Sequence, residues 1–187
     1  SGKTEIYVKL IEETIAAGKK VLYLLPEIAL TTQIINRLRK YFGDKVGVYN
    51  SRFNQNERVE IWNKQLSSSP YDIVLGARSA LFLPFDNLGL VVIDEEHDSS
   101  FKQFEPAPRY HARDSGVVLA KMFGAKVLMG SATPALETMH NSEMGKYGLV
   151  TLNSRYGGVH MPKIVISDLG KAKKAKKMQG DFSFQLL

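Results

Sequence analysis

Short runs of apolar residues alternate along the chain with longer segments in which apolar residues recur every three or four positions. The runs predict β-strands at Val21–Leu25, Val46–Tyr49, Ile73–Leu75, Leu90–Ile93, Val127–Met129 and Leu149–Leu152. The segments between them predict helices at Lys3–Ala17, Ile28–Phe42, Asn54–Leu66, Arg109–Phe123 and Pro134–Met144, with Pro134 in the first turn of its helix. Apolar runs separated by helices are typical of a parallel sheet with right-handed crossovers. The sequence therefore predicts an α/β fold, a mostly parallel sheet with helices on both faces.

The length of 187 residues suits one domain. We expect this domain to cover residues 1–160, and residues 161–187, with a strand-like run at Lys163–Ile166, to be a linker towards a further domain. The net charge is +6, but without the five lysines of Lys171–Lys177 it would be +1. Such a lysine run is usually a solvated tail, so net charge alone does not indicate nucleic-acid binding.

The sequence excludes cysteine-based sites and a membrane-spanning helix. The chain has no cysteine, which excludes disulfides and thiolate zinc sites within it. No apolar run approaches the roughly 18 residues needed to cross a bilayer. We therefore expect no membrane partner and a cytoplasmic location.

The first residues, Ser1-Gly2-Lys3-Thr4, match the last four positions of the phosphate-binding pattern G-x-x-x-x-G-K-[ST]. The first four positions would precede Ser1, so we expect the chain to begin inside this loop. Gly2 lets the backbone approach phosphates, Lys3 neutralises their charge, and the Thr4 hydroxyl is a ligand for Mg²⁺. The pattern predicts ATP and Mg²⁺ as cofactors. An ordinary helix start with an exposed lysine is the alternative.

An acidic cluster, Asp94-Glu95-Glu96-His97, directly follows the apolar run Leu90–Ile93. At the tip of a strand, Asp94 suits the second contact to Mg²⁺, and Glu95 suits the base that activates the attacking water. The alternatives are an acidic surface turn, which leaves the upstream Gly-Lys-Thr unexplained, and a two-metal nuclease site, for which no other carboxylates cluster at strand ends. We predict Asp94 and Glu95 to be the catalytic pair.

Gly130-Ser131-Ala132-Thr133-Pro134 follows the next apolar run. Hydroxyl groups at a strand end can hydrogen-bond the acidic cluster and respond to its state. We therefore predict that His97, Ser131 and Thr133 couple this segment to the state of the acidic cluster. A polar cap between strand and helix is the competing explanation.

Aromatic and cationic residues are interleaved after the acidic cluster, and Pro106 and Pro108 exclude a regular helix there. Aromatic side chains can stack on bases while neighbouring cations meet phosphates. Phe101, Lys102 and Phe104 are therefore candidate DNA contacts. Packing of the two phenylalanines on the domain is the alternative.

Five segments occur in a fixed order: S-G-K-T, L-L-P-E-I-A-L-T-T-Q, G-A-R-S-A-L-F, D-E-E-H and S-A-T-P. Together they resemble the motifs of superfamily 2 helicases. Over residues 1–169, the sequence resembles more narrowly the PriA family of bacterial replication-restart helicases. The segments that carry this likeness are P-E-I-A-L-T, R-S-A-L-F and D-E-E-H-D-S-S-F-K-Q. The resemblance implies the first, RecA-like P-loop NTPase lobe of a two-lobed motor that couples ATP hydrolysis to 3′-to-5′ movement on DNA.

The resemblance also implies sites and partners. Segments Pro26–Thr32 and Gly76–Ser79 would face single-stranded DNA, with Pro26, Thr31, Arg78 and Ser79 as contacts, since such motors mainly grip the backbone. Single-stranded and forked DNA, other primosome proteins and single-strand-binding protein are the implied partners, near the bacterial nucleoid. Zinc, further DNA-binding domains and a second lobe with arginine fingers are expected elsewhere in a longer protein, so the isolated chain should be nearly inactive.

Two other functions remain open. A translocase subunit of a restriction or repair complex would share the motor without fork restart. A catalytically inert lobe could bind DNA or partner proteins without turnover.

Overall fold

The computed structural model describes residues 2–50, 53–153, 166–184 and 186. The described residues divide into two compact units, Gly2–Thr151 and a second one made of the described residues from Leu152 onwards. This division falls before the predicted boundary at residue 160. The role of the second unit as a linker remains a prediction.

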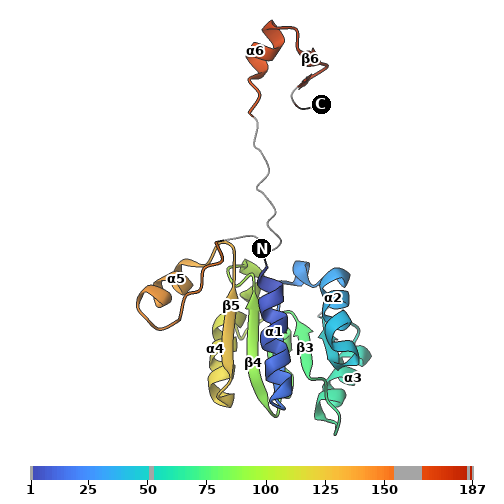
Figure 1. Cartoon of the computed structure of the whole chain (residues 1–187). Coiled ribbons are helices and arrows are strands. Elements are labelled where there is room, and N and C mark those ends of the chain that lie inside the picture. Colours follow the sequence, from blue (N-terminus) through green and yellow to red (C-terminus); the bar gives the residue numbers. More distant parts are fainter. Residues whose placement is uncertain (1, 51–52, 154–165, 185, 187) are drawn as a thin grey trace. The chain divides into compact units, whose positions relative to one another are not determined.

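The first unit is built on a five-stranded sheet in the order β2-β3-β1-β4-β5, and every neighbouring pair is parallel (Figure 1). The strands are β1 (Lys20–Leu24), β2 (Val46–Tyr49), β3 (Ile73–Gly76), β4 (Leu88–Asp94) and β5 (Lys126–Gly130). They confirm five of the predicted strands and the α/β class. The predicted strand Leu149–Leu152 is wrong, because these residues have no regular secondary structure. An apolar run becomes a strand only where a neighbour takes its backbone hydrogen bonds.

Helices cover both faces of the sheet, as predicted. On one face, α1 (Lys3–Ala16) and α2 (Thr32–Phe42) pack against strand residues such as Val21 and Tyr23. On the other, α3 (Gln55–Leu66) and α4 (Ala112–Phe123) pack against the alternate residues, such as Leu22 and Leu24. Because side chains of a strand point alternately to the two faces, Val21 and Tyr23 of β1 belong to one core and Leu22 and Leu24 to the other. The sheet is thus buried on both sides.

Some helices begin later than predicted. A short 3-10 turn, η1 (Glu27–Ala29), precedes α2, and η2 (Gly43–Lys45) follows it. α4 begins at Ala112 because His111 is extended and bridges to Lys102. α5 (Leu136–Glu143) begins two residues after Pro134, so the placement of Pro134 in its first turn is wrong. Two further 3-10 turns lie at η3 (Arg78–Phe82) and η4 (Ser99–Phe101).

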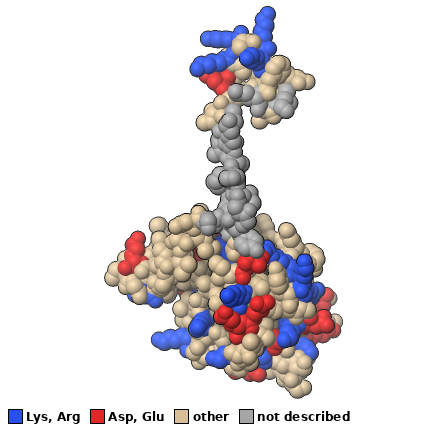
Figure 2. Space-filling model, viewed as in Figure 1, with Lys and Arg blue, Asp and Glu red and all other residues tan. Residues whose placement is uncertain are grey.

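The second unit contains α6 (Leu169–Lys174) and a small antiparallel pair, β6 (Met178–Gln179) with β7 (Phe182–Ser183). The Asp168 side chain caps α6 by accepting a hydrogen bond from the Lys171 N–H at 3.0 Å. Figure 2 shows lysines clustered on this unit, whereas acidic and basic residues are mixed on the visible face of the first unit. Most of the predicted strand Lys163–Ile166 lies outside the described residues. No helix in the described ranges is long and apolar enough to span a membrane.

Candidate nucleotide and DNA site

The predicted functional segments meet at one edge of the sheet. Asp94 at the end of β4 pairs with Gly130 at the end of β5, and Leu24 at the end of β1 pairs with Gly76 of β3. In open parallel sheets, ligands bind at the carboxyl ends of the strands. The acidic cluster, the Ser131 segment and the segments that follow β1 and β3 therefore leave the sheet on its ligand-binding edge.

Lys3, in the first turn of α1, reaches the acidic cluster. Its Nζ lies 2.7 Å from Glu95 Oε1 and 3.5 Å from Asp94 Oδ1. Gly2 precedes the helix with a φ of 87°, a left-handed conformation that glycine adopts without strain. The structure thus brings Gly2, Lys3, Asp94 and Glu95 together, while Ser1 lies outside the described residues. Thr4 follows Lys3 in the same turn.

Two buried tyrosines hold the carboxylate of Asp94. The Tyr7 hydroxyl donates to Oδ1 at 3.0 Å, and the Tyr23 hydroxyl donates to Oδ2 at 3.2 Å. Burial, reinforced by the charge of Asp94, raises the pKa of both tyrosines far above the usual range, so both remain donors. Sequence reasoning missed this pair. The available signal was a tyrosine at two core positions, because a buried phenol usually finds a hydrogen-bond partner.

Gly130 makes room for this arrangement. A Cβ atom at this position would lie 1.6 Å from the Tyr7 hydroxyl oxygen. Only glycine therefore lets β5 pass beside the Tyr7–Asp94 hydrogen bond.

Glu95 leaves the strand in a left-handed conformation, with a φ of 51°. Non-glycine residues rarely adopt this conformation, and such strain is concentrated at functional sites. The side chain is partly exposed and points to Lys3, and its Oε2 lies 3.8 Å from His97 Nδ1. A carboxylate that water can reach, beside the lysine predicted to bind phosphate, suits a general base.

Of the three residues predicted to couple the two segments, only His97 and Ser131 contact each other through their side chains. Ser131 Oγ and His97 Nδ1 are 2.7 Å apart, which links the segment after β5 to the acidic cluster. Thr133 takes part through its backbone, since its N–H donates to Ser131 Oγ at 3.0 Å. Thr133 itself is exposed.

The donor set fits Mg²⁺. Thr4 offers a hydroxyl and Asp94 a carboxylate, both hard oxygen ligands. Mg²⁺ keeps several waters and commonly binds through one or two carboxylates plus substrate phosphates, so a larger protein cage is not required. When bound, the ion neutralises phosphate charge. Among the described residues, no three His, Cys, Asp or Glu side chains form a metal cluster.

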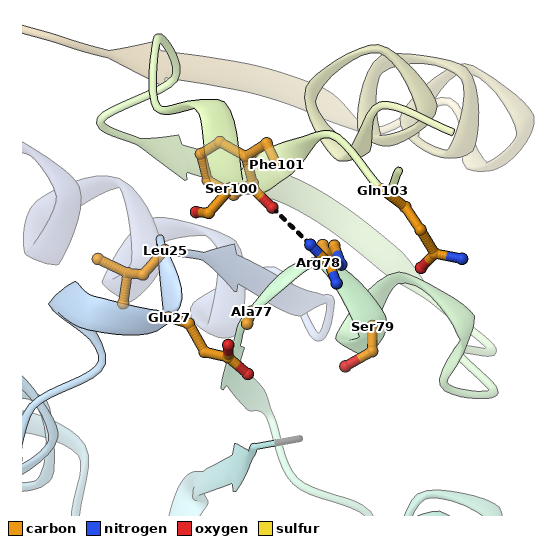
Figure 3. A pocket seen from close by; sticks show the side chains of 8 residues that line it. All are labelled: Leu25, Glu27, Ala77, Arg78, Ser79, Ser100, Phe101 and Gln103. Carbon is orange, nitrogen blue, oxygen red and sulfur yellow. Dashed lines mark hydrogen bonds between the residues drawn. The ribbon is translucent and has the colours of Figure 1, made fainter. Parts of the chain in front are cut away.

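A cavity of about 120 Å³ lies beside the segments predicted to face DNA (Figure 3). Its lining residues come from the ends of β1 and β3 and from the segment after the acidic cluster: Leu25, Glu27, Ala77, Arg78, Ser79, Ser100, Phe101 and Gln103. Arg78 Nη1 donates to the Ser100 carbonyl oxygen at 3.0 Å. Of the predicted contacts, Thr31 is exposed and Arg78 and Ser79 are half-buried. Pro26 is buried, so its assignment as a DNA contact is corrected: its carbonyl oxygen accepts hydrogen bonds from the N–H groups of Ala29 and Leu30.

The segment after η4 is a loop, as its prolines predicted, and it is closed by hydrogen bonds. The Gln103 N–H donates to the Tyr110 carbonyl at 2.9 Å, and Arg109 Nε donates to the Phe104 carbonyl at 2.7 Å. Phe104 is 60% exposed, with Lys102 Nζ 5.2 Å from its ring centre. Phe101 is only 1% exposed, so its predicted stacking on a base is wrong. The two phenylalanines divide between the core and the surface.

Comparison with known proteins found a matching family model and several similar relatives. Residues 1–142 match the family model described as DEAD/DEAH box helicase. The chain is 51% identical over 176 residues to the replication restart protein PriA of Rickettsia conorii, 44% identical over 187 residues to that of Haemophilus influenzae and 43% identical over 169 residues to that of Bacillus subtilis. These matches cover 94%, 100% and 90% of the chain but 27%, 25% and 21% of the relatives. The chain thus spans about a quarter of their length.

Two solved structures share the fold. RecG bound to a three-way DNA junction is 25% identical, with a TM-score of 0.55, and the match covers 78% of this chain and 18% of RecG. The helicase MrfA is 20% identical, with a TM-score of 0.50, over 78% of this chain and 25% of its own. Both matches support a RecA-like fold for this chain.

Proposed function

This chain belongs to the DEAD/DEAH box helicase family, and from this membership we propose that it is the first, ATP-binding lobe of a replication-restart DNA helicase. The similarity to PriA proteins of three bacteria supports the restart role. The observation that carries the proposal is the meeting of Lys3 with Asp94 and Glu95 at the ligand-binding edge of the sheet.

In the proposed reaction, Lys3 binds the β- and γ-phosphates and Glu95 takes a proton from the attacking water. Thr4 and Asp94 would hold Mg²⁺, with Tyr7 and Tyr23 fixing the orientation of the Asp94 carboxylate. Helicases of this kind complete their site with arginines from a second lobe, and such a residue contributes roughly 10³–10⁵ in rate. We therefore expect the chain on its own to hydrolyse ATP very slowly.

Single-stranded and forked DNA is the proposed partner, held along the backbone by the segment around Arg78 and Ser79 and by the loop that carries Lys102 and Phe104. We further propose 3′-to-5′ movement, a cytoplasmic location at the bacterial nucleoid, and assembly with primosome proteins and single-strand-binding protein. Zinc would bind elsewhere in the longer protein.

The test is to measure ATP hydrolysis and unwinding by the full-length protein on forked DNA, single-stranded DNA and blunt duplex. Forks with a 3′ or a 5′ single-stranded tail give the direction. The proposal predicts hydrolysis that DNA stimulates, with forks and 3′ tails preferred. Equal stimulation by blunt duplex and forks would favour a general translocase, and binding without turnover would favour an inert lobe.

A further inference from the structure

Glu96, the third residue of the acidic cluster, is only 1% exposed, and its carboxylate contacts Arg113 and the start of α5. Its backbone N–H donates to the Gly130 carbonyl at 3.1 Å, so the turn after β4 is joined to the end of β5. The family takes its name from boxes that read D-E-A-D or D-E-A-H, with alanine at the third place. An alanine has no side-chain oxygen, so the contacts of Glu96 are a departure that the nucleotide chemistry of Asp94 and Glu95 does not explain.

The carboxylate of Glu96 accepts hydrogen bonds from the beginning of α5. Oε1 accepts from the Ala135 N–H at 2.8 Å, and Oε2 accepts from the Thr138 hydroxyl at 2.8 Å. Ala135 is the N-cap residue of α5 and has no capping side chain. Because the first N–H groups of a helix lack intrahelical partners and favour negative charge, Glu96 performs the capping from 39 residues away.

A buried arginine pairs with the same carboxylate. Arg113 Nη1 of α4 lies 3.3 Å from Glu96 Oε2, and the arginine side chain is 9% exposed. Burial lowers the pKa of Arg113, but the hydrogen bond and charge of Asp114 and those of Glu96 outweigh it and raise the pKa overall. Glu96 therefore has a permanent cationic partner on α4 and two donors on α5.

The segment Ser131–Thr133 lies between β5 and the residues that Glu96 holds. On its other side, Ser131 Oγ contacts His97 Nδ1 at 2.7 Å. Consecutive residues of the acidic cluster thus fix the segment from two sides, Glu96 at the start of α5 and His97 at Ser131.

We infer that Glu96 is a positioning residue that ties the Ser131–Thr133 segment and the start of α5 to the acidic turn, so that these parts shift together when nucleotide changes the turn. This inference rests on the proposed function. In the proposed function, Asp94 and Glu95 act on nucleotide. Glu96 would transmit the position of the turn to α5. Removing a single hydrogen bond to Glu96 should uncouple ATP hydrolysis from unwinding without abolishing hydrolysis.

The test uses Thr138→Val in the full-length protein, because valine keeps the shape of threonine and removes only the hydroxyl. Thr138→Ser restores the donor and is the rescue variant. Glu137→Gln is the matched control, since Glu137 is the neighbouring residue, is 73% exposed in its side chain and lies 3.9 Å from Arg113. Nucleotide affinity, DNA-stimulated hydrolysis and base pairs unwound per ATP are measured together. A second readout is hydrogen exchange in residues 95–98 and 131–139, with and without a non-hydrolysable ATP analogue.

For Thr138→Val we expect nearly unchanged nucleotide affinity and fewer base pairs unwound per ATP, because loss of one hydrogen bond to a charged group shifts the equilibrium that holds α5 to the turn by roughly tenfold. Thr138→Ser and Glu137→Gln should behave as the wild type. In the hydrogen-exchange measurement, bound nucleotide should slow exchange in both segments of the wild type. In Thr138→Val it should slow exchange only in residues 95–98. Unwinding per ATP that stays at the wild-type value, or nucleotide-dependent protection of both segments in Thr138→Val, overturns the inference. A wild-type protein that fails to hydrolyse ATP on DNA contradicts the proposed function instead, and the exchange readout still decides the role of Glu96.

Discussion

Lys3 Nζ lies 2.7 Å from Glu95 Oε1, although 92 residues separate the two in the sequence. The first turn of α1 and the turn after β4 meet at the same edge of the sheet, and Asp94 lies 3.5 Å from the same ammonium group. A phosphate that contacts Lys3 would thus lie within reach of both carboxylates. Proximity of this kind is what activation of an attacking water requires.

Replacing Lys3 with alanine should weaken nucleotide binding by roughly tenfold or more, because a charged group that hydrogen-bonds phosphate contributes about 1.5–3 kcal/mol. Titration with a fluorescent ADP analogue measures the affinity. Lys9→Ala is the control, since Lys9 is an exposed lysine of the same helix. Equal affinities of the two variants would remove Lys3 from the phosphate site.

Replacing Tyr7 or Tyr23 with phenylalanine removes one donor to Asp94 and keeps the ring in the core. We expect a higher Mg²⁺ concentration for half-maximal ATP hydrolysis, since the net contribution of such a hydrogen bond is about 1 kcal/mol. A Mg²⁺ titration of the full-length protein measures this, with Tyr41→Phe, at an exposed tyrosine of α2, as the control. An unchanged Mg²⁺ dependence in both core variants would show that the tyrosines serve packing alone.

Gly130→Ala should damage the site through Tyr7. The new Cβ would lie 1.6 Å from the Tyr7 hydroxyl oxygen, so the ring must move away from Asp94. Overpacking of this kind typically costs about 1–3 kcal/mol of stability, and ATP hydrolysis should fall with it. Gly148→Ala, with open space around its Cβ, is the control. Thermal melts and ATPase rates equal to the control would contradict the close approach.

The sequence was informative where local signals carry the structure. Apolar periodicity located five strands, and the spacing of Gly-Lys-Thr and Asp-Glu indicated that Lys3, Asp94 and Glu95 belong to one site. The fold brings these three residues together. These predictions succeeded because strand ends of a parallel sheet meet at one edge whatever the details of packing.

Side-chain direction could not be predicted in the same way. Phe101 and Phe104 have similar cationic neighbours in the sequence, yet η4 directs Phe101 into the core and leaves Phe104 on the surface. The roles of Tyr7, Tyr23 and Glu96 depend on partners that are 87, 71 and 39 residues away, respectively. Only tertiary packing specifies such contacts.

Because Phe101 is buried and Phe104 is exposed, replacing each with alanine distinguishes an effect on folding from an effect on DNA contact. Phe104→Ala should reduce DNA stimulation of hydrolysis, because stacking on a base contributes roughly 1–3 kcal/mol, and should leave the melting temperature nearly unchanged. Phe101→Ala should cost roughly 3–5 kcal/mol of stability. Melting temperature and ATPase with and without single-stranded DNA are measured for both variants. A large loss of stability in Phe104→Ala, with both activities equally reduced, would place Phe104 in the core as well.

We propose that this lobe activates water for ATP hydrolysis through Glu95. The most direct measurement compares nucleotide binding and DNA-stimulated hydrolysis in full-length wild type, Glu95→Gln and the control Glu105→Gln, which alters an exposed loop carboxylate. We predict that Glu95→Gln binds nucleotide like the wild type but hydrolyses it about 10²–10⁴ times more slowly, the contribution of a positioned general base. Near-normal turnover by Glu95→Gln would contradict the role of Glu95 as the base.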